Sequence, residues 1–207
     1  METTLYNNDK HGHKRLKICV SGAAEAGHCG PNAMEAAKDL GREIVRQGGV
    51  LVTGATTGFP LWSAMGAKEV GGVSIGLSPA INEREHKEVY RLPTDYMDLI
   101  IYTGFLGYPG RDILLVRSSD AVLFGCGRIG TIDEFAISYQ DGKVIGVLQG
   151  DWEMSAELKD VLEDESKVHD NIVFDTDPKK LVAKVIALVN KNKVTEFSLA
   201  GSVNKEV

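Results

Sequence analysis

The stretch DAVLFGCGRIGTIDE, residues 120–134, decides the fold of this chain. It predicts a buried strand over 121–124, apolar on both faces, then a glycine-rich turn and a helix that begins at Thr131. The turn contains three glycines, Gly125, Gly127 and Gly130. Glycines let a backbone turn sharply and approach a ligand closely. Free N–H groups at a helix start bind anions, so the stretch predicts a phosphate site.

Glu134 lies one turn into the same predicted helix, beside the anion site. A carboxylate in that position suggests a chemical role. Thr131 and Glu134 also fit a T-x-x-E capping box, in which the glutamate accepts a backbone N–H at the helix start. The spacing alone leaves both interpretations open.

Short apolar strands alternate with helices along the whole chain. Strands are predicted at 16–20, 50–53, 73–77, 99–102, 121–124, 144–148 and 172–174, and helices at 31–47, 61–70, 111–118, 131–140, 154–162 and 178–190. This pattern indicates an α/β fold, a Rossmann-like, doubly wound parallel sheet with helices on both faces. We expect one domain over 16–190, flexible tails at 1–15 and 191–207, and a polar excursion at 78–95 that is either a lid or a dimer contact.

Composition excludes several classes of protein. The 207 residues are 43% hydrophobic and 25% charged, with a net charge of −6 and no basic block, so we expect no nucleic-acid partner. No apolar run approaches the ~20 residues of a membrane span, and residues 1–15 lack the apolar core of a signal peptide. The 3 cysteines include no C-x-x-C pair, which predicts a reducing, cytoplasmic setting without a disulfide framework.

Three glycine loops should gather at the carboxyl edge of the sheet, where ligands bind in this fold: 21–22, 54–58 and 125–130. The first has the spacing of a P-loop, but His28 and Cys29 stand where lysine and a hydroxyl residue are needed, so an NTPase is excluded. It also lacks G-x-G-x-x-G, which disfavours NAD. A mononucleotide or similar small phosphorylated ligand remains, with no resident cofactor.

Metal binding and thiol chemistry are not expected from the sequence. The histidines His28, His86 and His169 are scattered and show no metal-ligand spacing, so we expect no metal. Cys126 has no histidine in its own motif, which favours a small packing residue over a nucleophile.

The segments RDILLVRSSDA (111–121) and GRIGTIDE (127–134) resemble the Lonely Guy (LOG) family, also called lysine decarboxylase-like. Its pattern is an arginine opening a helix, then R-x-S-D, then P-G-G-x-G-T-x-x-E. The resemblance covers roughly residues 16–189. The segments GAKEVGG (66–72) and EFAISYQ (134–140) are similar to the molybdenum-cofactor-carrier-like branch of that superfamily. Cys126 and Arg128 replace the family's proline and second glycine.

LOG enzymes hydrolyse the N-glycosidic bond of nucleoside 5′-monophosphates, especially N6-prenylated AMP, to the free base and ribose 5-phosphate. The resemblance implies that Arg111 and Glu134 are the catalytic pair and that the chain is a homodimer or larger homo-oligomer. The resemblance also implies that Gly127, Gly130 and Thr131 bind the phosphate. Further expected substrate-binding residues are Arg128, which can add a cation to the phosphate pocket, and the loop residues Ser21, Gly22, Gly54, Thr57 and Gly58. The chemistry agrees, because a carboxylate stabilises the positive charge that develops on ribose.

Two alternatives stay open. In the first, Arg111 forms a surface salt bridge with Asp112 instead of serving a site. In the second, the whole protein is a non-catalytic carrier or sensor of a nucleotide or molybdopterin-type cofactor. Lysine decarboxylation is excluded, because it needs a pyridoxal Schiff-base lysine and no lysine has a suggestive setting.

Overall fold

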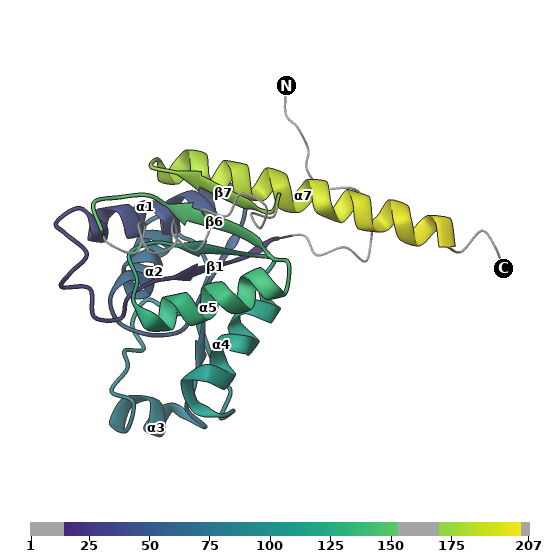
Figure 1. Cartoon of the computed structure of the whole chain (residues 1–207). Helices are drawn as coiled ribbons and strands as arrows, with labels where there is room; N and C mark the ends of the chain where they lie inside the picture. The colour runs from purple at the N-terminus through teal and green to yellow at the C-terminus, as the bar shows by residue number, and fades with distance from the viewer. Residues whose placement is uncertain (1–14, 153–169, 204–207) are drawn as a thin grey trace.

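The computed structural model describes residues 15–152 and 170–203, with side chains to 193, and its core is a parallel sheet between two helical layers (Figure 1). The strands are β1 Lys17–Ser21, β2 Val50–Thr53, β3 Ser74–Ser78, β4 Leu99–Tyr102, β5 Ala121–Phe124, β6 Val144–Leu148 and β7 Ile172–Asp175. The helices are α1 Ala33–Arg46, α2 Phe59–Glu69, α3 Glu83–Glu88, α4 Gly107–Ser118, α5 Ile129–Gln140 and α7 Pro178–Val203.

The strand order explains where a ligand can bind. The 7 strands run β4-β3-β2-β1-β5-β6-β7, and every neighbouring pair is parallel. The chain therefore winds outward from β1 to β4, crosses back and winds outward again from β5. The loops after β1 and β5 diverge, which opens a crevice at their carboxyl ends. The predicted Rossmann-like fold is confirmed.

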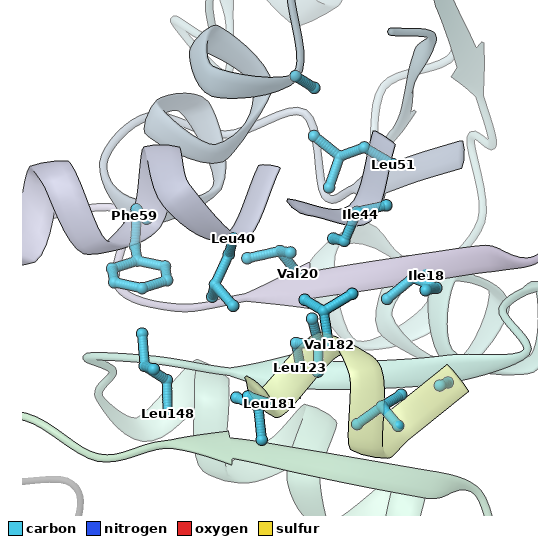
Figure 2. Close-up of a cluster of buried hydrophobic side chains, with 14 of the residues drawn as sticks. Ile18, Val20, Leu40, Ile44, Leu51, Phe59, Leu123, Leu148, Leu181 and Val182 are labelled. Carbon is cyan, nitrogen blue, oxygen red and sulfur yellow. The ribbon is translucent and has the colours of Figure 1, made fainter. Parts of the chain in front are cut away.

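Alternate residues of the central strands face two separate cores, because each strand is covered on both sides. Ile18 and Val20 pack beneath α1, α2 and α7, where Figure 2 shows them with Leu40 and Leu181. Cys19, between them in the sequence, faces the other layer, which α4 and α5 cover. A one-residue shift of β1 would exchange these two faces, so the apolar pattern fixes its register.

The predicted bounds of β2, β4, β5 and β6 are confirmed, while several helix ends differ. The helix α4 begins at Gly107, four residues before the predicted start, so Arg111 lies inside it instead of opening it. The short helix α3 lies in the 78–95 excursion, where none was predicted. The prediction at 154–162 falls outside the described residues. The described helices include none that is long and apolar enough to cross a membrane.

The last helix is longer than predicted. Instead of ending at 190, α7 continues to Val203 through a segment predicted to be a flexible tail, and Figure 1 shows it projecting beyond the sheet. Lys193 in this extension forms an ion pair with Asp120 at 2.9 Å, and Lys17 forms another at 2.9 Å. Burial opposes ionisation of Asp120, but hydrogen bonds from Lys193 and Lys17 outweigh it and lower its pKa to about 2. Asp120 therefore ties the start of β1 to α7.

Candidate functional site

A cavity of about 320 Å³ opens at the carboxyl ends of the central strands, between the loops after β1 and β5 and the start of α4. This volume suits a small ligand. Its lining includes eight of the predicted site residues, Ser21, Gly22, Gly54, Arg111, Arg128, Gly130, Thr131 and Glu134. The sheet therefore brings the predicted loops together at its crevice.

Arg111 and Glu134 meet inside this cavity from two different helices, α4 and α5. The guanidinium Nη1 lies 3.7 Å from the carboxylate Oε1, and the two residues are only 5% and 8% exposed. Ser21, at the end of β1, donates a hydrogen bond from its hydroxyl to the other oxygen of Glu134. The acidic group is therefore held from two sides, by a cation and by a neutral donor.

The loop after β2 leaves space for the guanidinium. A Cβ on Gly54 would lie 1.5 Å from Arg111 Nη1, so only glycine fits there with the arginine in this position. The Arg111 guanidinium also lies 5.5 Å from the centre of the Tyr108 ring, close enough for a cation–π contact. These neighbours fix where the charge points.

Asp112 is a site residue that the sequence analysis considered only as a surface partner of Arg111. It is 5% exposed, lines the cavity, and places Oδ1 3.0 Å from Arg111 Nε. The expectation of a surface salt bridge is wrong, because both partners are buried. Burial raises the pKa of Asp112 to about 8, and the Glu134 charge adds to this while Arg111 opposes it. The cavity thus holds a second carboxyl group that is protonated near neutral pH.

The start of α5 rules out the capping-box interpretation. The helix begins at Ile129, not Thr131, and Arg128 occupies the N-cap position. The Thr131 N–H donates to the Arg128 carbonyl at 2.8 Å, so Thr131 lies within the first turn. Glu134 is too far along the helix to cap it and points into the cavity instead. The Arg128 side chain is 58% exposed and adds a cation at the rim.

Some predicted contacts lie elsewhere. Within the described chain, Thr57, Gly58 and Gly127 are outside the lining of the cavity. Thr57 instead donates to the Ala24 carbonyl at 3.0 Å, which ties the loop after β2 to the loop after β1. The lining also includes residues that the sequence analysis missed, namely Ala23, Ala24, Glu25, Thr56, Pro60 and Tyr108. Of the two adjacent threonines, Thr56 lines the cavity and Thr57 does not, and the sequence alone does not reveal which of them faces it.

The cysteines contradict one expectation. Cys29 and Cys126 form a disulfide, although the sequence predicted none. His28 Nε2 lies 3.5 Å from Cys126 Sγ, although no histidine accompanies Cys126 in its motif. The two cysteines are 97 residues apart, and the pairing of β1 with β5 brings their loops together. His86 is buried between Ser78 and the Pro93 carbonyl, and His169 lies outside the described residues.

Comparison with known proteins supports the fold and identifies the family. The model of the SLOG cluster4 family matches residues 15–182. An uncharacterized protein of Archaeoglobus fulgidus is 32% identical over 134 residues, 65% of this chain and 82% of that protein. The molybdenum cofactor binding protein of the phototrophic bacterium Rippkaea orientalis is 26% identical, with a TM-score of 0.68 over 86% of this chain and 99% of that one. The Moco carrier protein of Chlamydomonas reinhardtii is also 26% identical, with a TM-score of 0.69 over 86% and 99%.

Proposed function

Because this chain belongs to the SLOG cluster4 family, we propose that its cavity binds a nucleoside 5′-monophosphate and hydrolyses the N-glycosidic bond. The substrate is AMP or N6-modified AMP, and the products are the free base and ribose 5-phosphate. The observation that carries this proposal is the buried pair of Arg111 and Glu134, 3.7 Å apart at the wall of the cavity.

The phosphate binds at the first turn of α5. Gly130 and Thr131 line the cavity there. The Thr131 N–H already donates to the Arg128 carbonyl, so the N–H groups that would bind the anion are those that precede it in the first turn. Arg128 at the N-cap adds a positive charge at the rim, where it reaches a phosphate that remains partly solvated. The ribose then lies deeper, toward Glu134 and Arg111.

The reaction uses the two buried carboxyl groups differently. The Glu134 carboxylate stabilises the positive charge that develops on ribose C1′ and takes a proton from the attacking water. Asp112, whose pKa is raised to about 8, carries a proton near neutral pH and gives it to the departing base. Water thus adds its hydroxyl group to C1′ as the C1′–N bond breaks. Arg111 orients Glu134 and binds ribose or phosphate oxygens.

Chromatographic assay of released base from AMP and N6-prenyl-AMP tests the reaction. We expect turnover by the wild-type chain. Glu134→Gln removes the charge of the carboxylate, Arg111→Lys removes the bidentate guanidinium, and each should lower the turnover rate at least about 100-fold. Arg117→Lys is the matched control, because Arg117 only clamps Asp141 at the end of α5, with Nε 2.9 Å from Oδ2. Absence of free base from both nucleotides at high enzyme concentration rules out hydrolysis of these substrates.

A second candidate is a non-catalytic carrier of a molybdopterin-type cofactor as cargo. It is favoured by the molybdenum-cofactor proteins of R. orientalis and C. reinhardtii, which align over nearly their whole length. The donor set suits a phosphate ester, because the Arg128 guanidinium and the first turn of α5 both lie at the rim of the cavity, where a phosphate would bind. A carrier predicts thermal stabilisation by its cargo without any product. Binding that survives Glu134→Gln while no base is released from any nucleotide favours this candidate.

A further inference from the structure

A second cluster of reactive side chains lies outside the lining of the cavity. His28, Cys29 and Cys126 place one ligand atom each within 4.8 Å of one another. Cys29 and Cys126 are 1% and 0% exposed, and their Cα atoms are 5.6 Å apart. The mechanism proposed above uses none of the three.

We propose that this cluster binds a zinc-type divalent cation when the disulfide is reduced. Two thiolates and an imidazole are the ligands that Zn²⁺ prefers, and a water completes the tetrahedron. With Zn–S bonds of about 2.3 Å, the two sulfurs of a tetrahedral site lie about 3.8 Å apart. The three ligand atoms already lie within 4.8 Å of one another, and the two sulfurs, which are bonded in the disulfide, reach this separation by side-chain rotation once the bond is reduced.

The orientation of His28 points to a ligand rather than a packing residue. Its Nε2 faces both sulfurs, at 3.5 Å from Cys126 and 3.9 Å from Cys29. The Gly127 carbonyl, 3.3 Å away, is the other polar group at this nitrogen. The buried Nδ1 has no hydrogen-bond partner among the described residues, so the polar contacts of this ring are all at Nε2, the nitrogen that faces the sulfurs.

The disulfide and the metal site are alternative states of the same atoms. A dithiol reductant breaks the S–S bond, becomes a cyclic disulfide and leaves two protein thiols. The cation then displaces both thiol protons and forms two metal–sulfur bonds and one bond to Nε2. A low-molecular-weight disulfide as oxidant reverses these steps, because two-electron oxidation of the thiolates restores the S–S bond and releases the cation.

Both states join the same two loops. Cys29 belongs to the loop after β1, which contributes Ser21 and Gly22 to the cavity, and Cys126 lies in the turn that leads into α5. The Ala23 N–H also donates to the Cys126 carbonyl at 2.8 Å, so the sulfur link lies next to the cavity wall. The cation therefore maintains a cross-link between the two loops under reducing conditions.

Titration of the full-length protein with Co²⁺, a spectroscopic substitute for Zn²⁺, tests the proposal. The chain is reduced with a phosphine, desalted without oxygen and compared with its oxidised form. We expect one Co²⁺ per reduced chain with a sulfur-to-cobalt charge-transfer band, displacement by Zn²⁺, and no such band from the oxidised chain. Cys126→Ser and His28→Ala should weaken binding at least about 100-fold, since even outer-shell changes cost 10–100-fold.

Cys19→Ala is the matched control, because burial raises the pKa of the Cys19 thiol and keeps it a poor ligand. His11→Ala/His13→Ala distinguishes binding by the N-terminal histidines, which gives no sulfur band. Failure of the reduced wild-type chain to take up Co²⁺, or an equal band in Cys126→Ser, overturns the proposal. The comparison of the oxidised and reduced wild-type chains remains decisive even where a variant folds poorly.

Discussion

Substitution of Gly54 by alanine should damage the site through one contact. The added Cβ would lie 1.5 Å from Arg111 Nη1 and 2.6 Å from Cζ, so the guanidinium must move. The backbone itself tolerates alanine, because Gly54 is not among the residues with positive φ in the described chain. The damage is therefore confined to the arginine and the groups that it contacts.

The size of the effect follows from what Arg111 loses. The guanidinium is the end of a flexible side chain, so it swings away from the loop, but it is 5% exposed and has little solvent to move into. Complete isolation of a buried charge from its partner costs about 3–5 kcal/mol, and a guanidinium that moves but stays near Glu134 and Asp112 loses only part of that. We expect a loss of about 2 kcal/mol in the free energy of unfolding and at least tenfold weaker AMP binding.

Urea denaturation and calorimetric titration with AMP measure both quantities. Gly27→Ala is the matched control, because a Cβ there meets no atom of the described chain within 4 Å, and it should change stability by under about 0.5 kcal/mol. The double variant Gly54→Ala/Arg111→Met should lose less than the sum of its parts, since methionine removes the clashing atoms. Additive losses, or wild-type stability in Gly54→Ala, would refute the reasoning.

Three further perturbations test other parts of the structure. The pKa of Asp112 rises to about 8 on folding, so the unfolded chain loses this proton first, and the free energy of unfolding should fall as pH rises from about 4 to 8. Asp112→Asn should flatten this pH dependence in urea denaturation. An unchanged pH dependence would assign it to other groups. Leu114 is 39% exposed on α4. Where light scattering finds the homo-oligomer that the family resemblance implies, we expect Leu114→Glu to lower its mass, whereas an unchanged mass would place the interface elsewhere. Lys193→Ala removes one of the two partly exposed ion pairs of Asp120 and should lower the free energy of unfolding by up to about 1 kcal/mol in thermal or urea denaturation. A loss of several kcal/mol would show that this contact stabilises α7 far more than a surface ion pair does.

The sheet could be predicted from the sequence because its strands are continuous apolar runs. β5, buried at all four positions, was predicted with its true bounds, and the same holds for β6. Helix ends were harder. The start of α5 was missed because Arg128 caps it without a side-chain hydrogen bond, so no residue type marks the position. The polar residues after 190 hid the extension of α7.

Site residues that belong to a local sequence motif were predicted, whereas contacts between segments distant in the sequence were missed. Arg111 and Glu134 each belong to a recognisable pattern, and parallel strands bring those patterns to one edge. The link between Cys29 and Cys126 depends on two loops 97 residues apart, which no local spacing encodes. Asp112 acquires its raised pKa mainly from burial, a property of the folded state.

The position of β1 in the middle of the sheet has a consequence for synthesis. Strands β1 to β4 are synthesised first, and they can assemble into half of the sheet before translation of the chain is complete. One edge of β1 then stays open until residues 121–124 emerge, about 100 residues after β1 itself, and an open edge recruits foreign strands. A nascent chain stalled before this point should therefore depend most on chaperones.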